Sequence, residues 1–177
     1  LPAVARAITP GQIDTFEDGT PMAWEEGPVS PDPPFNVATG GPAGAGDHFL
    51  RDNSNGEFAS PGGKLTMYNV TQWTGDYVAA GVTALTVDLA NFGPTPLYIR
   101  VALQGTSGQY CSTTPFVLPA DGQWRTATFG LNAAELTAVA LNVPLATFLT
   151  NITMLRVLSA QGAPTFHGDE VVGALGV

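Results

Sequence analysis

The residues best suited to chemistry are three carboxylates in the stretch "DTFEDGTPMAW", namely Asp14, Glu17 and Asp18. They surround one aromatic ring and stand just before Gly19, which favours a tight turn. Carboxylates on such a turn can act as general acids and bases, ligate a hard cation together with backbone carbonyls, or stay solvated. These alternatives correspond to an enzyme, a metal-stabilised domain and an ordinary surface turn.

The remaining residues give catalysis no positive support. Paired carboxylates hydrolyse glycosides only at about 5–9.5 Å separation in a cleft, and a sequence does not fix that distance. Only His48 and His167 could act as imidazole bases, and no serine lies in a Gly-x-Ser-x-Gly motif. Cys111, the single cysteine, lies in a predicted strand, where a small buried apolar residue is the usual role. We therefore expect that the protein is not an enzyme.

The charge balance restricts the partners. Asp and Glu outnumber Lys and Arg by 15 to 6, which gives a net charge of −9. Such a surface repels phosphate backbones, so we expect no nucleic-acid partner, and divalent cations are the more natural counter-ions. No apolar run approaches the roughly 20 residues that a membrane-spanning helix needs. Because the chain begins with Leu1 and not with Met, we expect that a leader was removed or the chain shortened.

The elements that must position these residues are mostly strands. Alternating apolar and β-branched runs between turn residues predict strands at residues 12–17, 48–51, 64–70, 82–92, 97–104, 110–118, 124–131, 152–159 and 170–175. The segments "TQWTGDYVAAG" (71–81) and "LNAAELTAVA" (131–140) carry helix-capping patterns and predict short helices. "RDNSNGE" (51–57) does not fit an EF-hand loop, and we interpret it as a polar hairpin turn.

Strands with few helices in 177 residues predict one all-β domain, a jelly-roll β-sandwich of two antiparallel sheets with one or two short helices. We assign residues 12–177 to this domain and residues 1–11 to an N-terminal extension. The Pro- and Gly-rich residues 28–46 form a long connection.

Five segments together resemble a known family: "DTFEDGTPMAW", "PPFNVATGGPAGAGDHFL", "QWTGDYVAAGVTALTVDLANFG", "LPADGQW" and "ITMLRVL". The chain is similar to secreted bacterial PEP-CTERM-type (exosortase-sorted) proteins. Their exported domain resembles the galactose-binding-like jelly roll that many carbohydrate-binding modules use. The resemblance implies a location that is secreted, extracellular or at the cell surface, and it implies a structural calcium ion near the turn after the first strand. Fold analogy by itself leaves the function open.

For that calcium ion, Glu17 and Asp18 before Gly19 offer the carboxylate and backbone oxygens that Ca²⁺ prefers. Asp47 and Asp169 would complete the site if their segments lie alongside. The alternative is an acidic, solvated turn. A bound calcium would be structural and would stabilise the fold without catalysing a reaction.

Exposed aromatic rings would suit polysaccharide binding, in which a sugar stacks on the ring beside polar side chains. Trp24 lies in a predicted loop and is the best candidate for such a platform, and Trp73 is the second. Trp124 opens a predicted strand, and we expect it in the core.

The first nine residues, "LPAVARAIT", form an apolar segment that can adopt a strand, and Pro10-Gly11 forms a hinge after it. Such a segment can add as a strand to the open sheet edge of a neighbouring subunit, with Leu1, Val4 and Ile8 as the assembly residues. Repeated head-to-tail addition would build a filament as a homopolymer. Our leading hypothesis is therefore a secreted structural subunit of an extracellular matrix, surface layer or fibre that self-associates. The alternative is a carbohydrate-binding module.

Overall fold

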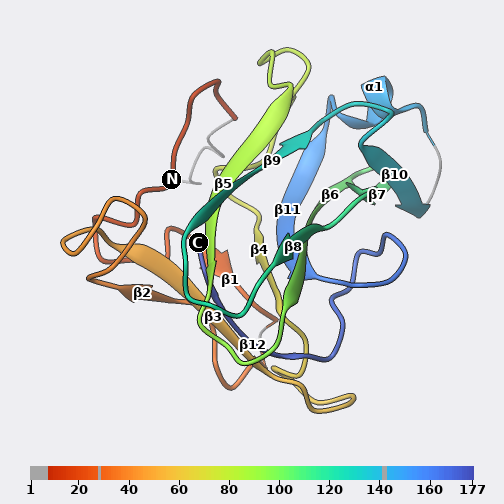
Figure 1. The fold of residues 1–177 in the computed structure, drawn as a ribbon. Helices are drawn as coiled ribbons and strands as arrows, with labels where there is room; N and C mark the ends of the chain where they lie inside the picture. The colour runs from red at the N-terminus through yellow and green to blue at the C-terminus, as the bar shows by residue number, and fades with distance from the viewer. Residues whose placement is uncertain (1–7, 28, 141–142) are drawn as a thin grey trace.

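The structure, a computed structural model, describes residues 8–27, 29–140 and 143–177. Two antiparallel sheets pack face to face, with one short helix, α1 (Leu145–Phe148), at the edge (Figure 1). The predicted all-β sandwich is therefore confirmed. Within the described ranges, no helix is long and apolar enough to cross a membrane.

One sheet has seven strands in the order β1-β4-β11-β6-β7-β10, and β8 also pairs with β6. Its longest ladder joins β6 and β11, whose apolar residues alternate with a period of two, as the sequence predicts. The bounds are β1 (Trp24–Glu25), β4 (Thr66–Asn69), β6 (Leu97–Gly105), β7 (Gly108–Ser112), β8 (Phe116–Leu118), β10 (Leu136–Ala140) and β11 (Ile152–Ser159).

The other sheet has five strands in the order β2-β3-β12-β5-β9. The bounds are β2 (Phe35–Val37), β3 (Phe49–Asn55), β5 (Ala84–Asn91), β9 (Arg125–Gly130) and β12 (Val172–Gly176). Strands from the beginning and the end of the chain thus lie side by side in this sheet, and the C-terminus lies beside β5 (Figure 1).

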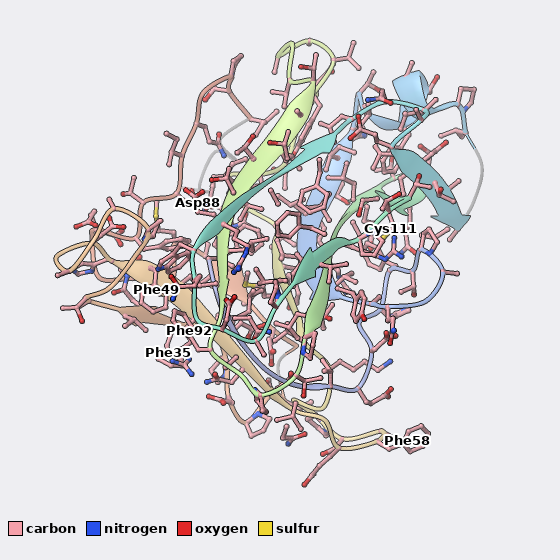
Figure 2. All side chains as sticks on the ribbon, in the orientation of Figure 1. Phe35, Phe49, Phe58, Asp88, Phe92 and Cys111 are labelled. Atoms are coloured by element: carbon pink, nitrogen blue, oxygen red, sulfur yellow. The ribbon has the colours of Figure 1, made fainter. Side chains whose placement is uncertain are left out.

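The main core fills the space between the two sheets. Its members include Leu50 on β3, Leu89 on β5, Ile99 on β6 and Val157 on β11, each less than 5% exposed. A smaller cluster around Cys111, Leu158 and Phe166 covers the outer face of the seven-stranded sheet. Cys111 lies within this smaller cluster, away from the main core (Figure 2). Burial raises the pKa of its thiol above the ordinary value.

Both predicted short helices are wrong. Residues 71–81 form a series of turns, and residues 136–140 form strand β10, which pairs with β7. Pairing with the edge of a sheet overrides a weak helical preference because the segment gains a ladder of backbone hydrogen bonds. The short helix α1 lies instead at residues 145–148, after Pro144.

One strand prediction and one turn prediction also need correction. Residues 12–17 do not form a strand, because Phe16 adopts a left-handed backbone conformation that ends any ladder there. The predicted polar hairpin at residues 51–57 is mostly strand, because β3 continues to Asn55. The side chains of Asp52 and Ser54 on β3 point inward, at the alternate positions that follow the buried Leu50.

Candidate functional site

A cavity of about 280 Å³ opens beside β5. One wall is the irregular segment of residues 12–16, and the opposite wall is β5 with Leu85 and Val87. Val101, Leu155 and Val157 of the seven-stranded sheet form an aliphatic floor. The cavity therefore reaches from the surface to the space between the two sheets.

The backbone of β5 is open along this cavity. On one side, residues 84–89 pair with β9, from Ala84↔Gly130 to Leu89↔Arg125. On the other side, β12 pairs with β5 only at Leu175↔Asn91 and Gly176↔Ala90. No strand in the described chain pairs with residues 84–88 on that second side. An unpaired edge of this kind can accept a further strand.

Asp14 organises the inner end of the cavity. Its Oδ2 atom accepts hydrogen bonds from the indole nitrogens of Trp24 at 2.8 Å and Trp73 at 2.6 Å, and from Gln72 Nε2 at 3.0 Å. Gln72 Nε2 also donates to the carbonyl oxygen of Met22 at 2.6 Å. Asp14 thus fixes two aromatic rings in the cavity wall, which is a structural role for the first acid of the "DTFEDG" stretch.

The backbone around Asp14 is strained. Phe16, Met22 and Ala23 have φ values of 58°, 48° and 59°, although none of them is glycine. Each such residue costs roughly 1–2 kcal/mol, so the surrounding contacts must hold the segment in place. The buried ring of Phe16 and the hydrogen bonds to Asp14 supply those contacts.

The polar rim of the cavity is built by the loop before β3. Glu17 Oε1 accepts the backbone N–H of His48 at 2.9 Å, and Asp47 Oδ2 accepts that of Ala43 at 2.7 Å. The His48 ring lies 3.1 Å from Asn36 Oδ1. Each of the two acids therefore already accepts a hydrogen bond from the protein, and both help to hold the loop.

The other two acids assigned to calcium lie in separate turns. Asp18 Oδ1 accepts hydrogen bonds from Thr20, and these bonds lower the pKa of Asp18. Asp169 Oδ2 accepts the backbone N–H of Gln161 at 2.7 Å. Among the described residues, no group of three or more His, Cys, Asp or Glu side chains is arranged to hold a metal ion. Calcium binding by Glu17, Asp18, Asp47 and Asp169 stays a prediction.

The exposed platform expected at Trp24 is wrong. Trp24 lies on β1, is only 6% exposed and belongs to the main core, with its N–H bonded to Asp14. Trp73 is half-buried and packs against the same core. Trp124, which we expected in the core, is also half-buried, and its ring packs edge-on against Phe49 and Phe92. Figure 2 shows these two phenylalanines lying together.

Of the three residues assigned to assembly, Leu1 and Val4 lie outside the described residues. Ile8 is 4% exposed within its own domain, and its backbone N–H donates to the carbonyl oxygen of Thr74 at 2.9 Å. Ile8 therefore packs in its own sandwich, and it is not part of a strand donated to a neighbour.

Sequence reasoning missed three groups of polar residues. It did not find the hydrogen bonds of Asp14 to Trp24 and Trp73, the buried Arg100, or the buried pair Glu26 and Asp52. The alternation of Asp52 and Ser54 with Leu50 was the available signal, because a period of two continues through them.

The residues that line the cavity are suited to burying an apolar group. In the described chain they include aliphatic side chains, two indole rings, three aspartates and His48, but no Ser, Cys or Lys. No protein-family model, no curated protein and no solved structure matches this chain. The function must therefore be inferred from geometry.

Proposed function

We propose that the protein is a non-catalytic structural subunit that self-associates by strand addition outside the cell. Residues 1–7 of one copy would add along β5 of a second copy and place apolar side chains in the cavity beneath it. The observation that carries this proposal is the unpaired edge of β5 above an aliphatic cavity.

Strand addition needs two features on the acceptor. It needs free backbone N–H and C=O groups for affinity and pockets for alternate side chains for specificity. Residues 84–88 of β5 supply the first feature, and Leu85 and Val87, which face the cavity, supply the second. These features support an extended apolar peptide as the occupant.

Length and charge support residues 1–7 as the donor. Seven extended residues span about 23 Å, and the six residues 84–89 of β5 span about 20 Å. Arg6 is the only charged residue among the first thirteen, and the acceptor cavity carries Asp14, Asp47 and Asp88. The donor and the acceptor therefore have opposite charge, which favours pairing between copies that otherwise repel.

The test uses two complementary defects. Deletion of residues 1–7 removes the donor, and Val87→Lys blocks the acceptor with a charge. We expect concentration-dependent oligomers of the full chain in sedimentation velocity and monomers for each variant alone. A mixture of the two variants should give a one-to-one dimer and nothing larger, because one copy supplies the strand and the other the groove.

The matched control is Val117→Lys on β8, where the valine is 54% exposed and lies outside the cavity. It should assemble like the unmodified chain, and circular dichroism should show that all variants are folded. A full chain that stays monomeric at several hundred micromolar would contradict the proposal. A mixture of variants that forms no dimer would contradict it as well.

Carbohydrate binding is the second candidate, and one observation favours it. A shallow cleft beside the half-buried Trp124 is lined by Asp88, Arg125 and Thr126, which can bind hydroxyl groups. A polysaccharide pull-down with Trp124→Ala and, as a control, Trp73→Ala tests this site. It ranks second because the ring of Trp124 is half-buried and already packs against Phe49 and Phe92, whereas sugar stacking needs an exposed ring face.

A further inference from the structure

Two acidic side chains are buried together between the sheets. Glu26 follows β1 and is 7% exposed, and Asp52 lies in the middle of β3 and is 1% exposed. Glu26 follows a strand of one sheet and Asp52 lies in the other, and each carboxyl group affects the pKa of its neighbour, so the two groups lie near each other. Buried carboxylates need donors or a positive charge to offset the loss of water.

This pair lacks such partners. Glu26 Oε1 and both carboxylate oxygens of Asp52 are buried without a hydrogen-bond donor, and Ser30 donates only to Glu26 Oε2. Thr66 Oγ1 is the one other buried side-chain atom without a partner in the described chain. Three of the four unpartnered atoms therefore belong to one pair of carboxylates.

Other buried polar side chains of the sandwich are well bonded. Asn69 donates to Met22 O and accepts from Thr71 N–H, and Asn91 donates to Thr95 O and accepts from Gly93 N–H. These two asparagines therefore have hydrogen-bond partners, whereas Glu26 Oε1 and both Asp52 oxygens have none among the described residues. This contrast indicates that a partner other than the described residues completes the pair.

The local charge favours a cation as that partner. Burial raises the pKa of Asp52 well above its ordinary value, and the negative charges of Glu26 and Asp32 raise it further. Among the described residues, no basic side chain offsets these charges at Asp52. A single proton shared by the two carboxyl groups would still leave one oxygen of Asp52 without a donor, whereas one cation can contact all three oxygens.

We propose that Glu26 and Asp52 bind one calcium ion between the two sheets. All available ligands are oxygens, from two carboxylates and the Ser30 hydroxyl, and hard oxygen ligands select Ca²⁺ over Zn²⁺. An ion that takes its ligands at about 2.3–2.6 Å can contact oxygens from two neighbouring carboxyl groups at once. The site differs from the one expected at Glu17, Asp18, Asp47 and Asp169.

The ion would join the loop after β1 to β3 and so tie one sheet to the other. With only two carboxylates, the site should be weak, with a dissociation constant of about 10⁻⁴–10⁻³ M, the range of extracellular modules. This inference goes beyond the proposed function, because it concerns the stability of each subunit and is independent of assembly.

The test is calorimetric titration of the chelator-treated full chain with CaCl₂ at pH 7.5. We expect one ion per chain in the unmodified protein and no binding in Asp52→Asn or Glu26→Gln. In melting experiments, about ten times the dissociation constant of calcium should raise the midpoint of the unmodified protein by about 3–6 °C. Both variants should show no such rise.

The matched controls are Asp169→Asn and Glu17→Gln, which remove the same chemical groups from the sites that the sequence suggested. They should keep both the titration and the shift in melting midpoint. Absence of calcium binding in the unmodified protein would overturn the proposal and leave a shared proton as the explanation. Binding that survives Asp52→Asn but disappears in Glu17→Gln would overturn it in favour of the loop acids.

Discussion

Arg100 and the pair Glu26–Asp52 are all buried charged groups, but they differ in how many hydrogen bonds they make with the rest of the chain. Arg100 lies on β6, is 2% exposed, and donates to four carbonyl oxygens at 2.6–2.9 Å, those of Ala160, Ser112, Thr113 and Gly162. Glu26 and Asp52 receive one hydrogen bond between them, from Ser30.

The difference follows from what the backbone offers at each place. Arg100 faces the end of β7 and the loops that follow β7 and β11, where four carbonyl groups accept hydrogen bonds from its guanidinium group. Asp52 lies in a central strand whose own N–H groups face the neighbouring strands, so no donor reaches it. The backbone around Arg100 therefore compensates its charge. The pair Glu26–Asp52 lacks such compensation among the described residues and, in our proposal, needs a bound ion.

The largest expected effect comes from breaking the satisfied site. Arg100→Met would remove the donor from four carbonyl oxygens, two of them in buried hydrogen bonds, and we expect the free energy of unfolding to fall by at least about 3 kcal/mol. The free energy of unfolding of Arg100→Lys should lie between those of the unmodified protein and Arg100→Met, because one ammonium group cannot reach all four oxygens. Urea denaturation measures the difference. A loss below 1 kcal/mol for Arg100→Met would contradict this account of the site.

At the pair Glu26–Asp52 we expect a substitution to raise the free energy of unfolding. In chelator at pH 7.5, Asp52→Asn removes a buried negative charge, and we expect the free energy of unfolding to rise by about 1–2 kcal/mol. Urea denaturation with EGTA measures it, and Asp169→Asn serves as the control with little change. A substantial loss of stability in Asp52→Asn would mean that its charge is already compensated within the chain.

The pH dependence should sharpen this contrast. In the folded protein the pKa values of Glu26 and Asp52 lie above their ordinary values of about 4, so the folded state binds more protons than the unfolded state. The contribution of this pair to metal-free stability should therefore be greatest at low pH and fall as the pH rises from about 4 through the raised values. Melting midpoints in EGTA between pH 4.5 and 8 test this, and Asp52→Asn should flatten the slope.

The smallest effect is expected at a charge pair on the surface. Lys64 Nζ lies 3.6 Å from Glu170 Oε1, and both side chains are partly exposed, at 41% and 30%. Lys64→Met should change the free energy of unfolding by less than about 1 kcal/mol, because solvent screens such pairs. The effect should shrink further in 0.5 M NaCl. A loss in the free energy of unfolding as large as that of Arg100→Met would show that burial does not determine how much a charged side chain contributes to the stability of this protein.

The sequence predicted elements whose pattern is local, and it failed for elements that depend on a strand or loop far away in the chain. Strand β11 has the predicted bounds 152–159, because its alternation is local and strong. Residues 136–140 were predicted as a helix, and they form a strand because β7 lies beside them. For the candidate site, the sequence pointed to the acidic stretch around Asp14 but not to its bonds with Trp73, which lies 59 positions away.

The amino-acid sequence by itself determined that this protein is an all-β sandwich, because alternating apolar residues can be buried only between two layers of strands. Only the tertiary structure decided which polar groups find partners and which strand edge stays open. Arg100 has hydrogen-bond partners, Asp52 has none among the described residues, and the edge of β5 opposite β9 has no paired strand at residues 84–88 among the described strands. Each of these outcomes depends on loops and strands far away in the chain, whose positions no local pattern encodes.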